Sequence, residues 1–85
     1  MKRLFTIRSE GNVFLAQVIT NNFIENASSI KSIFEHVMVD EFPLQLTQFD
    51  IQCIDDHIGM GSVFNEMDSK LYFFTWNSIN EIDVK

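Results

Sequence analysis

The sequence predicts a single α+β domain over residues 1–85: a mostly antiparallel sheet of about five strands, in the order ββαβββ, with one amphipathic helix on one face. First, a chain of 85 residues can form one hydrophobic core and is too short for two. Second, 46% of its residues are hydrophobic, which is too many for a disordered segment. Third, one stretch of helical periodicity is flanked on both sides by stretches that alternate as strands do.

The N-terminal part predicts a β-hairpin. Residues 3–9 are rich in β-forming side chains, with Phe5 and Ile7 on one side, and residues 13–20 have the same character. Between these stretches, Gly11-Asn12 is a typical turn signal. We therefore expect two antiparallel strands joined by a short turn.

A helix is expected after Asn26, whose side chain can cap the first turn. Apolar residues then recur at helical spacing, with polar residues between them. The apolar positions are Ala27, Ile30, Ile33, Phe34, Val37 and Met38. The helix should end near Asp40, because Pro43 disfavours helical backbone at the residue before it and cannot continue the helical hydrogen bonds.

Three further strands are expected in the second half of the chain. Residues 44–54 alternate as a strand does, and residues 55–61 are expected to form a loop. Residues 62–67 and 71–76 flank Asp68-Ser69 and predict a second hairpin with a four-residue connection. The type of the segment after residue 76 stays open.

The strands predict a sheet with two apolar faces. A helix of about 13 residues, roughly 20 Å long, covers only one face of such a sheet. Nevertheless, Leu71 and Phe73 alternate with the aromatic set Tyr72, Phe74 and Trp76. Because an uncovered apolar face is usually an interaction site, we expect a homodimer, a partner protein or the C-terminal segment to cover it. The aromatic set shares one face and consists either of core residues or of partner-binding residues, and the two interpretations carry equal weight.

The charge distribution predicts a partner protein with a basic surface. The net charge is -6, and no Lys or Arg occurs between Lys31 and Lys70. Acidic residues occupy this part of the chain, and the candidate partner-binding carboxylates among them are Asp50, Asp55, Asp56, Glu66 and Asp68. The electrostatic field of these negative charges repels nucleic-acid phosphates and attracts basic protein surfaces. Direct binding of nucleic acid is therefore not expected.

No catalytic residue, metal site or cofactor is predicted. Asp55-Asp56-His57 follows Cys53 and has the residue types of a metal site, but the chain lacks the ligand spacing of zinc sites. A solvated acidic loop is the favoured interpretation. Cys53 alternates with apolar residues and is expected to be a small core residue, not a nucleophile. Residues 59–61, Gly-Met-Gly, lack the pattern of a phosphate-binding loop and are expected to form a turn.

The protein is expected to be cytoplasmic. It has no apolar run approaching the roughly 20 residues of a membrane span. Thr6 and Arg8 interrupt the apolar stretch that a secretion signal needs, and the single cysteine, Cys53, agrees with a reducing compartment. The scarcity of Gly, Ala, Arg and Pro beside abundant Phe, Ile and Asn is typical of AT-rich genomes, including those of many bacteriophages. A phage-encoded protein would act in the cytoplasm of the host cell.

Two functions fit these features. The first is a small non-enzymatic protein that binds and inhibits or modulates a larger protein with a basic surface. In type, such a protein resembles anti-restriction and anti-CRISPR proteins, some of which mimic the charge of DNA, so that carboxylates would replace phosphates in a basic cleft. The alternative is a structural or assembly module that forms a homodimer through an apolar sheet face. In that case Tyr72, Phe74 and Trp76 matter more than the acidic residues.

Overall fold

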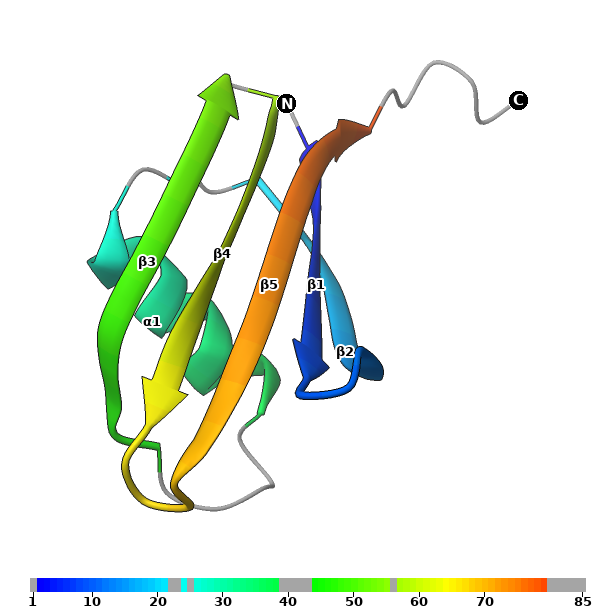
Figure 1. Cartoon of the computed structure of the whole chain (residues 1–85). Coiled ribbons are helices and arrows are strands. Elements are labelled where there is room, and N and C mark those ends of the chain that lie inside the picture. Colours follow the sequence, from blue (N-terminus) through cyan, green and yellow to red (C-terminus); the bar gives the residue numbers. More distant parts are fainter. Residues whose placement is uncertain (1, 22–23, 25, 39–43, 56, 80–85) are drawn as a thin grey trace.

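The fold is a five-stranded antiparallel sheet with one helix, in the predicted order ββαβββ. The computed structural model describes residues 2–21, 24, 26–38, 44–55 and 57–79, with the backbone alone for residues 53–55. The elements are β1 (Lys2–Ser9), β2 (Val13–Thr20), α1 (Ala27–Val37), β3 (Leu46–Asp55), β4 (Ile58–Asn65) and β5 (Lys70–Ile79). The predicted α+β class is therefore confirmed (Figure 1).

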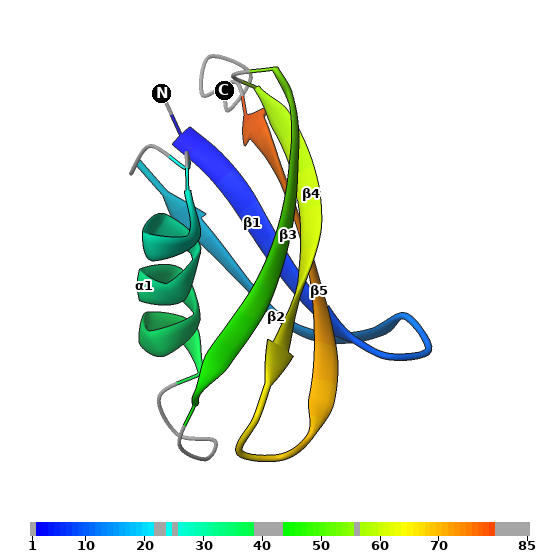
Figure 2. The ribbon, with the colours of Figure 1, turned by 60° about the vertical axis from the view of Figure 1, so that its left-hand side comes forward.

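The order of strands across the sheet is β2-β1-β5-β4-β3. The N-terminal and C-terminal strands lie side by side in its centre, where β1 and β5 pair from Lys2 opposite Ile79 to Ser9 opposite Tyr72. The β1–β2 hairpin is thus joined to the β4–β5 hairpin by the pairing of β1 with β5. Helix α1 lies on one side of the sheet, and the turn between β1 and β2 projects toward the other side (Figure 2).

Asn26 caps α1 as the sequence predicts. Its side-chain Oδ1 accepts a hydrogen bond from the Ser29 backbone N–H at 3.1 Å, which satisfies one of the free donors of the first turn. At the other end, the Met38 N–H donates to the Phe34 carbonyl at 2.9 Å. The expected stop near Asp40, and Pro43 with it, lie outside the described residues.

The core between α1 and the sheet is built from aromatic rings. Phe5 stacks on Phe74, with ring centroids 5.6 Å apart, and Trp76 continues the stack 6.2 Å from Phe74. From the helix, Phe34 meets both Phe5 and Phe74 edge-on. These are favourable geometries for aromatic pairs, each contributing about 0.5 to 1.5 kcal/mol beyond the burial of the rings. Tyr72 also packs here, so the core interpretation of Tyr72, Phe74 and Trp76 is the one that the structure shows.

The expected loop over residues 55–61 is wrong, because β4 already begins at Ile58 and contains both glycines. Gly59 lies opposite Trp76, and Gly61 lies opposite Phe74. A Cβ atom at Gly59 would lie 2.6 Å from Trp76 Cε2 and closer still to Cζ2, and one at Gly61 would lie 2.6 Å from Phe74 Cζ. At Gly61 the added atom would also meet the backbone oxygen of Asp50. The glycines are therefore in the strand to leave room for the two rings and for this close approach of β3, and they are not turn residues.

The second hairpin has the predicted four-residue connection between β4 and β5, and Asn65 holds it in place. The Asn65 side chain is completely buried, and its Oδ1 accepts hydrogen bonds from the backbone N–H groups of Gln45 at 2.8 Å and Met67 at 3.3 Å. It thereby ties the turn to the chain that enters β3. Among the described residues, no helix has the length and apolar character needed to cross a membrane.

Candidate binding face

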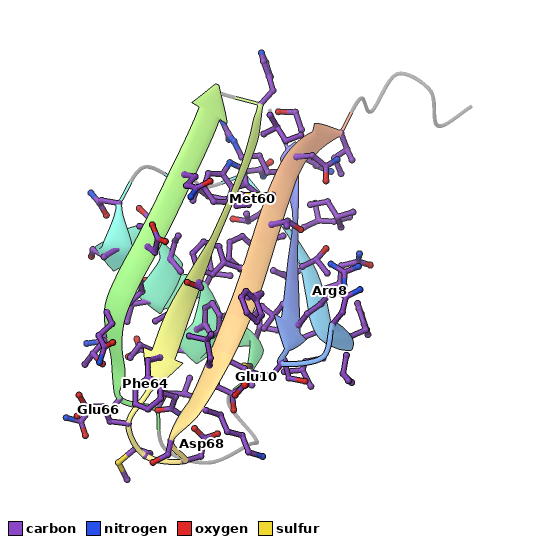
Figure 3. All side chains as sticks on the ribbon, viewed as in Figure 1. Arg8, Glu10, Met60, Phe64, Glu66 and Asp68 are labelled. Atoms are coloured by element: carbon purple, nitrogen blue, oxygen red, sulfur yellow. The ribbon has the colours of Figure 1, made fainter. Side chains whose placement is uncertain are left out.

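The side of the sheet that faces away from α1, which we call the open face, is turned toward the viewer in Figure 3. Its side chains form rows across the paired strands. One row crosses all five strands and contains, from β3 to β2, Asp50, Ser62, Phe73, Arg8 and Phe14. It runs from a carboxylate on one edge strand to exposed apolar surface on the other. Partner residues of an antiparallel pair lie on the same face, so these side chains are neighbours.

Apolar side chains on the open face are exposed to an unusual degree. The largest exposures are those of Phe14 (55%), Ile19 (56%), Ile58 (43%), Met60 (45%) and Phe73 (40%). The row between Ile19 and Phe14 begins with polar side chains, Gln17 and Thr6, where Gln17 Nε2 donates to Thr6 Oγ1 at 3.1 Å, and it continues through Thr75 to Met60. The open face therefore carries exposed apolar side chains interrupted by polar ones, so the apolar face that the sequence predicts is only partly apolar.

A bulge in β2 decides which of its side chains reach the open face. Ile7 pairs with Ala16 and Arg8 pairs with Phe14, so Leu15 is an extra residue between two regular pairs. Simple alternation would put Phe14 on the same face as Ala16. The bulge instead places Phe14 beside Arg8 on the open face and leaves Leu15 to line a small cavity together with Val37 and Met38 at the end of α1.

The open face has a shallow depression of about 370 Å³ over β3, β4 and β5. It lies between the exposed side chains of Met60 and Phe73, where Ser62 and Gly61 are small enough to leave space. The Asp50 carboxylate borders it. Asn12, at the tip of the β1–β2 turn, borders it as well, because this turn projects toward the open side of the sheet (Figure 2).

Asp50 is the predicted carboxylate that the structure places best for binding. Its side chain is exposed, and among the described residues it forms no hydrogen bond or ion pair. Met60 and Phe73 form the apolar walls beside it. Such a site suits a lysine or arginine side chain, since the aliphatic stem can lie on apolar surface while the charged end meets the carboxylate.

The other predicted carboxylates have different positions. Glu66 is exposed beyond the end of β4, and its Oε2 accepts from Thr47 Oγ1 at 3.2 Å. Asp68 is half-buried and stabilises its own turn: Oδ1 accepts from the Lys70 N–H at 3.1 Å, and Oδ2 accepts from the Tyr72 hydroxyl. Asp68 is therefore a turn residue more than a partner-binding one. Asp56 and the side chain of Asp55 lie outside the described residues.

Glu10 is a carboxylate that the sequence analysis missed. It follows β1, and its Oε1 accepts from the Leu71 N–H at 3.4 Å. Figure 3 shows Glu10 at the same end of the sheet as Glu66 and Asp68, with Phe64 beside them. Because Glu10 lies far from these residues in the sequence, only the pairing of β1 with β5 brings it to this end.

The aromatic set on β5 does not contribute to the open face. Tyr72, Phe74 and Trp76 are 3%, 1% and 1% exposed, so they are not available to a partner in this structure. The residues between them point the other way, and Phe73 supplies the exposed aromatic ring of β5. The alternation of β5 was predicted, but the larger aromatics face α1.

The described residues contain no group of three metal-ligating side chains. His57 Nδ1 lies 3.0 Å from the Ser78 hydroxyl, which links the start of β4 to β5. Cys53 and Asp55 are described by backbone alone, and Asp56 is not described.

The chain matches no protein-family model, and no curated protein or solved structure is significantly similar to it.

Proposed function

We propose that the protein is a non-enzymatic binding protein that attaches to a larger protein with a basic surface and inhibits or modulates it. The observation that carries this proposal is the depression on the open face, where the exposed carboxylate of Asp50 borders apolar walls formed by Met60 and Phe73. We infer that a lysine or arginine of the partner occupies this depression.

The chemistry of the depression favours a protein partner over a nucleic acid. A nucleotide would bring phosphates close to Asp50, and the net charge of -6 would oppose it. A basic side chain gains an ion pair with the carboxylate and apolar contact with Met60 and Phe73 at the same time. The long-range field of the chain would also speed the encounter with a basic surface.

Arg8 determines the orientation of such a partner. It lies next to Phe73 in the same row, on the side away from Asp50. The row is therefore acidic at the β3 end and basic near β1. A partner with a basic patch would place that patch over β3 and β4 and its neutral or acidic surface over β1.

A phage-encoded inhibitor of a host defence enzyme is one protein of this kind. Enzymes that act on nucleic acids hold phosphates in clefts lined with lysine and arginine, and these are the groups that the depression suits. In this proposal Asp50 replaces one phosphate, and Glu10 and Glu66 extend the acidic surface toward the turn end of the sheet (Figure 3).

The experiment compares three baits in quantitative affinity capture from a lysate of the host: wild type, Asp50→Lys and Glu35→Lys. Glu35 is exposed on α1, on the opposite side of the sheet, so both variants change the net charge equally and only one alters the depression. The partner is the protein retained by wild type and Glu35→Lys and lost by Asp50→Lys. Its affinity should fall about 10- to 100-fold with Asp50→Lys, as expected for loss of a close charge-assisted contact.

If Asp50→Lys and Glu35→Lys retain the same proteins, the depression is not the binding site. If both variants lose the same protein equally, binding depends on net charge alone. Either result would refute the assignment of the site to Asp50.

The alternative function is a homodimer through the apolar sheet face, and the exposed side chains of Met60 and Phe73 favour it. Two copies joined in this way would bury the depression. Met60→Glu should then convert a dimer into a monomer, as measured by sedimentation equilibrium, whereas the partner-binding function expects wild type and variant to have the same mass.

A further inference from the structure

Strand β2 forms one edge of the sheet, and after its bulge at Leu15 it lacks the features that usually protect an edge. It pairs only with β1 among the described strands. Its eight residues, Val-Phe-Leu-Ala-Gln-Val-Ile-Thr, include no charged residue, proline or glycine. Natural edge strands carry such residues because an exposed row of backbone N–H and C=O groups otherwise pairs with another strand.

The opposite edge, β3, is protected. Its register shifts between Thr47 and Asp50, where Gln48 has a φ of 55°, so the backbone is irregular at this point. The strand also carries the carboxylates of Asp50 and Asp55. Two copies of β3 placed side by side would bring like charges within a few ångströms of one another. The two edges of the same sheet therefore differ in their capacity to pair.

The charge distribution allows two copies to approach through β2. Strands β2 and β3 are four strand spacings apart, which is roughly 19 Å at about 4.8 Å per strand. This exceeds two Debye lengths at physiological ionic strength, where one Debye length is about 8 Å. In two copies joined at β2, the β3 carboxylates of one copy lie at least twice this 19 Å strand separation, roughly 38 Å, from those of the other copy. Their repulsion across such an interface is largely screened, although each chain has a net charge of -6.

A groove beside β2 can accept side chains from the added strand. It has a volume of about 290 Å³ and lies between the helix-facing side of β2 and α1. Val18 and Thr20 form one wall, and Ile33 and Val37 of α1 form the other. A strand added to β2 would place its helix-facing side chains over this groove, so the pairing would bury apolar surface in addition to forming backbone hydrogen bonds.

We propose that β2 pairs antiparallel with β2 of a second copy of this chain, so that two sheets join into one of ten strands around a two-fold axis. The regular part of β2 after the bulge, residues 16–20, forms the centre of the contact. An isologous contact of this kind closes after two copies. Pairing of β2 with β3 of the next copy would instead continue into a filament, and the bulge and charges of β3 oppose it.

This inference does not rest on the proposed function, because the β2 edge and the depression over β3, β4 and β5 are different surfaces. In the dimer the two open faces become one continuous surface, with the two depressions on its outer parts. A partner with two basic patches would then bind with both depressions at once.

The test is sedimentation equilibrium of wild type, Ile19→Glu and Ile58→Glu at about 100 µM, a concentration that populates even a dimer with micromolar dissociation constant. Both isoleucines are exposed, at 56% and 43%, and lie in one row on the open face, where Leu4 and Asn77 separate them. Ile19 is on β2, whereas Ile58 is on β4. We expect twice the chain mass of 9.9 kDa for wild type and Ile58→Glu, and the single mass for Ile19→Glu.

Hydrogen exchange of wild type provides the second measurement. Backbone amides of β2 should become more protected as the protein concentration rises, while amides of β3 should not change. The mass should also vary little between about 0.05 and 0.5 M salt, because no ion pair forms at the β2 edge. Circular dichroism confirms that the variants are folded.

A monomeric wild type at this concentration would overturn the proposal and leave the β2 edge to a strand from another protein. A dimer lost with Ile58→Glu and kept with Ile19→Glu would also overturn it and assign the contact to the open face. Loss of the dimer in both variants would do the same, since Ile58 lies three strands away from β2.

Discussion

Replacing Gly59 by alanine tests whether the glycines of β4 are required by the aromatic core. The added Cβ would lie 2.6 Å from Trp76 Cε2, well inside the contact distance of two carbon atoms. Trp76 cannot turn away, because it is 1% exposed and stacks on Phe5 and Phe74 at 6.3 and 6.2 Å. The backbone of β4 must move instead.

The expected loss of stability follows from two opposing contributions. Overpacking of a well-packed core costs about 1 to 3 kcal/mol. Alanine restricts the unfolded chain more than glycine does, and this stabilises the folded state by about 0.4 to 1 kcal/mol. The net loss in free energy of unfolding is therefore about 1 to 2 kcal/mol for Gly59→Ala. With a urea m-value near 1 kcal/mol/M for a domain of this size, the unfolding midpoint should fall by about 1 to 2 M.

Trp76 is the only tryptophan, so its fluorescence reports both the unfolding curve and the local packing. Gly59→Ala should also shift the native emission to longer wavelength, as the ring is displaced. Gly11→Ala is the matched control: its φ of 81° makes alanine unfavourable, but no atom lies within 4 Å of the added Cβ. That variant should lose stability without changing the emission of Trp76.

A double-mutant cycle with Trp76→Phe sharpens the test, with circular dichroism as the probe. The smaller ring removes the atoms that the new Cβ meets, so Gly59→Ala should cost less in the Trp76→Phe background than in wild type. Equal costs in the two backgrounds, or a Gly59→Ala variant as stable as wild type, would refute the requirement for glycine beside the rings of the core.

Three further substitutions test the hydrogen bonds that organise the fold, each by urea denaturation. Asn65→Ala removes the acceptor of two backbone N–H groups and should lower the free energy of unfolding by about 2 to 3 kcal/mol. An unchanged urea midpoint would mean that water replaces the lost acceptor. Asn26→Ala removes the cap of α1 and should cost about 1 kcal/mol, and Ser28→Ala, an exposed position in the same turn, should cost no stability. Tyr72→Phe removes the donor to Asp68 and should cost about 1 to 2 kcal/mol, and less than this when Asp68→Ala is already present.

The signals that predicted the elements correctly are local. The alternation of residues 3–9 and 13–20, the cap at Asn26 and the turn around Asp68 each depend on a few consecutive residues, and the structure confirms all of them. The error over residues 55–61 has a non-local cause. Glycine is normally a turn signal, and its presence in β4 is explained by neighbours on the adjoining strands, the rings of Trp76 and Phe74 and the backbone oxygen of Asp50.

The candidate site was predicted only in part for the same reason. Asp50 was identified from the charge pattern, but its apolar neighbours Met60 and Phe73 come from two other strands. Glu10 was missed because the turn that carries it meets β5 only in the folded chain. The bulge at Leu15 has no clear signal in the sequence, yet it moves Phe14 to the open face.

The sequence by itself determined the α+β class, the order of elements, the excess of negative charge and the presence of more apolar strand surface than one helix can cover. These properties follow from composition and from periodicities of two or about 3.6 residues, which short stretches contain. Only the tertiary structure decided which side of β5 faces α1, which strands form the edges and which carboxylate adjoins apolar surface. Each of these depends on pairings between residues far apart in the chain, and a single sequence does not contain the register of those pairings.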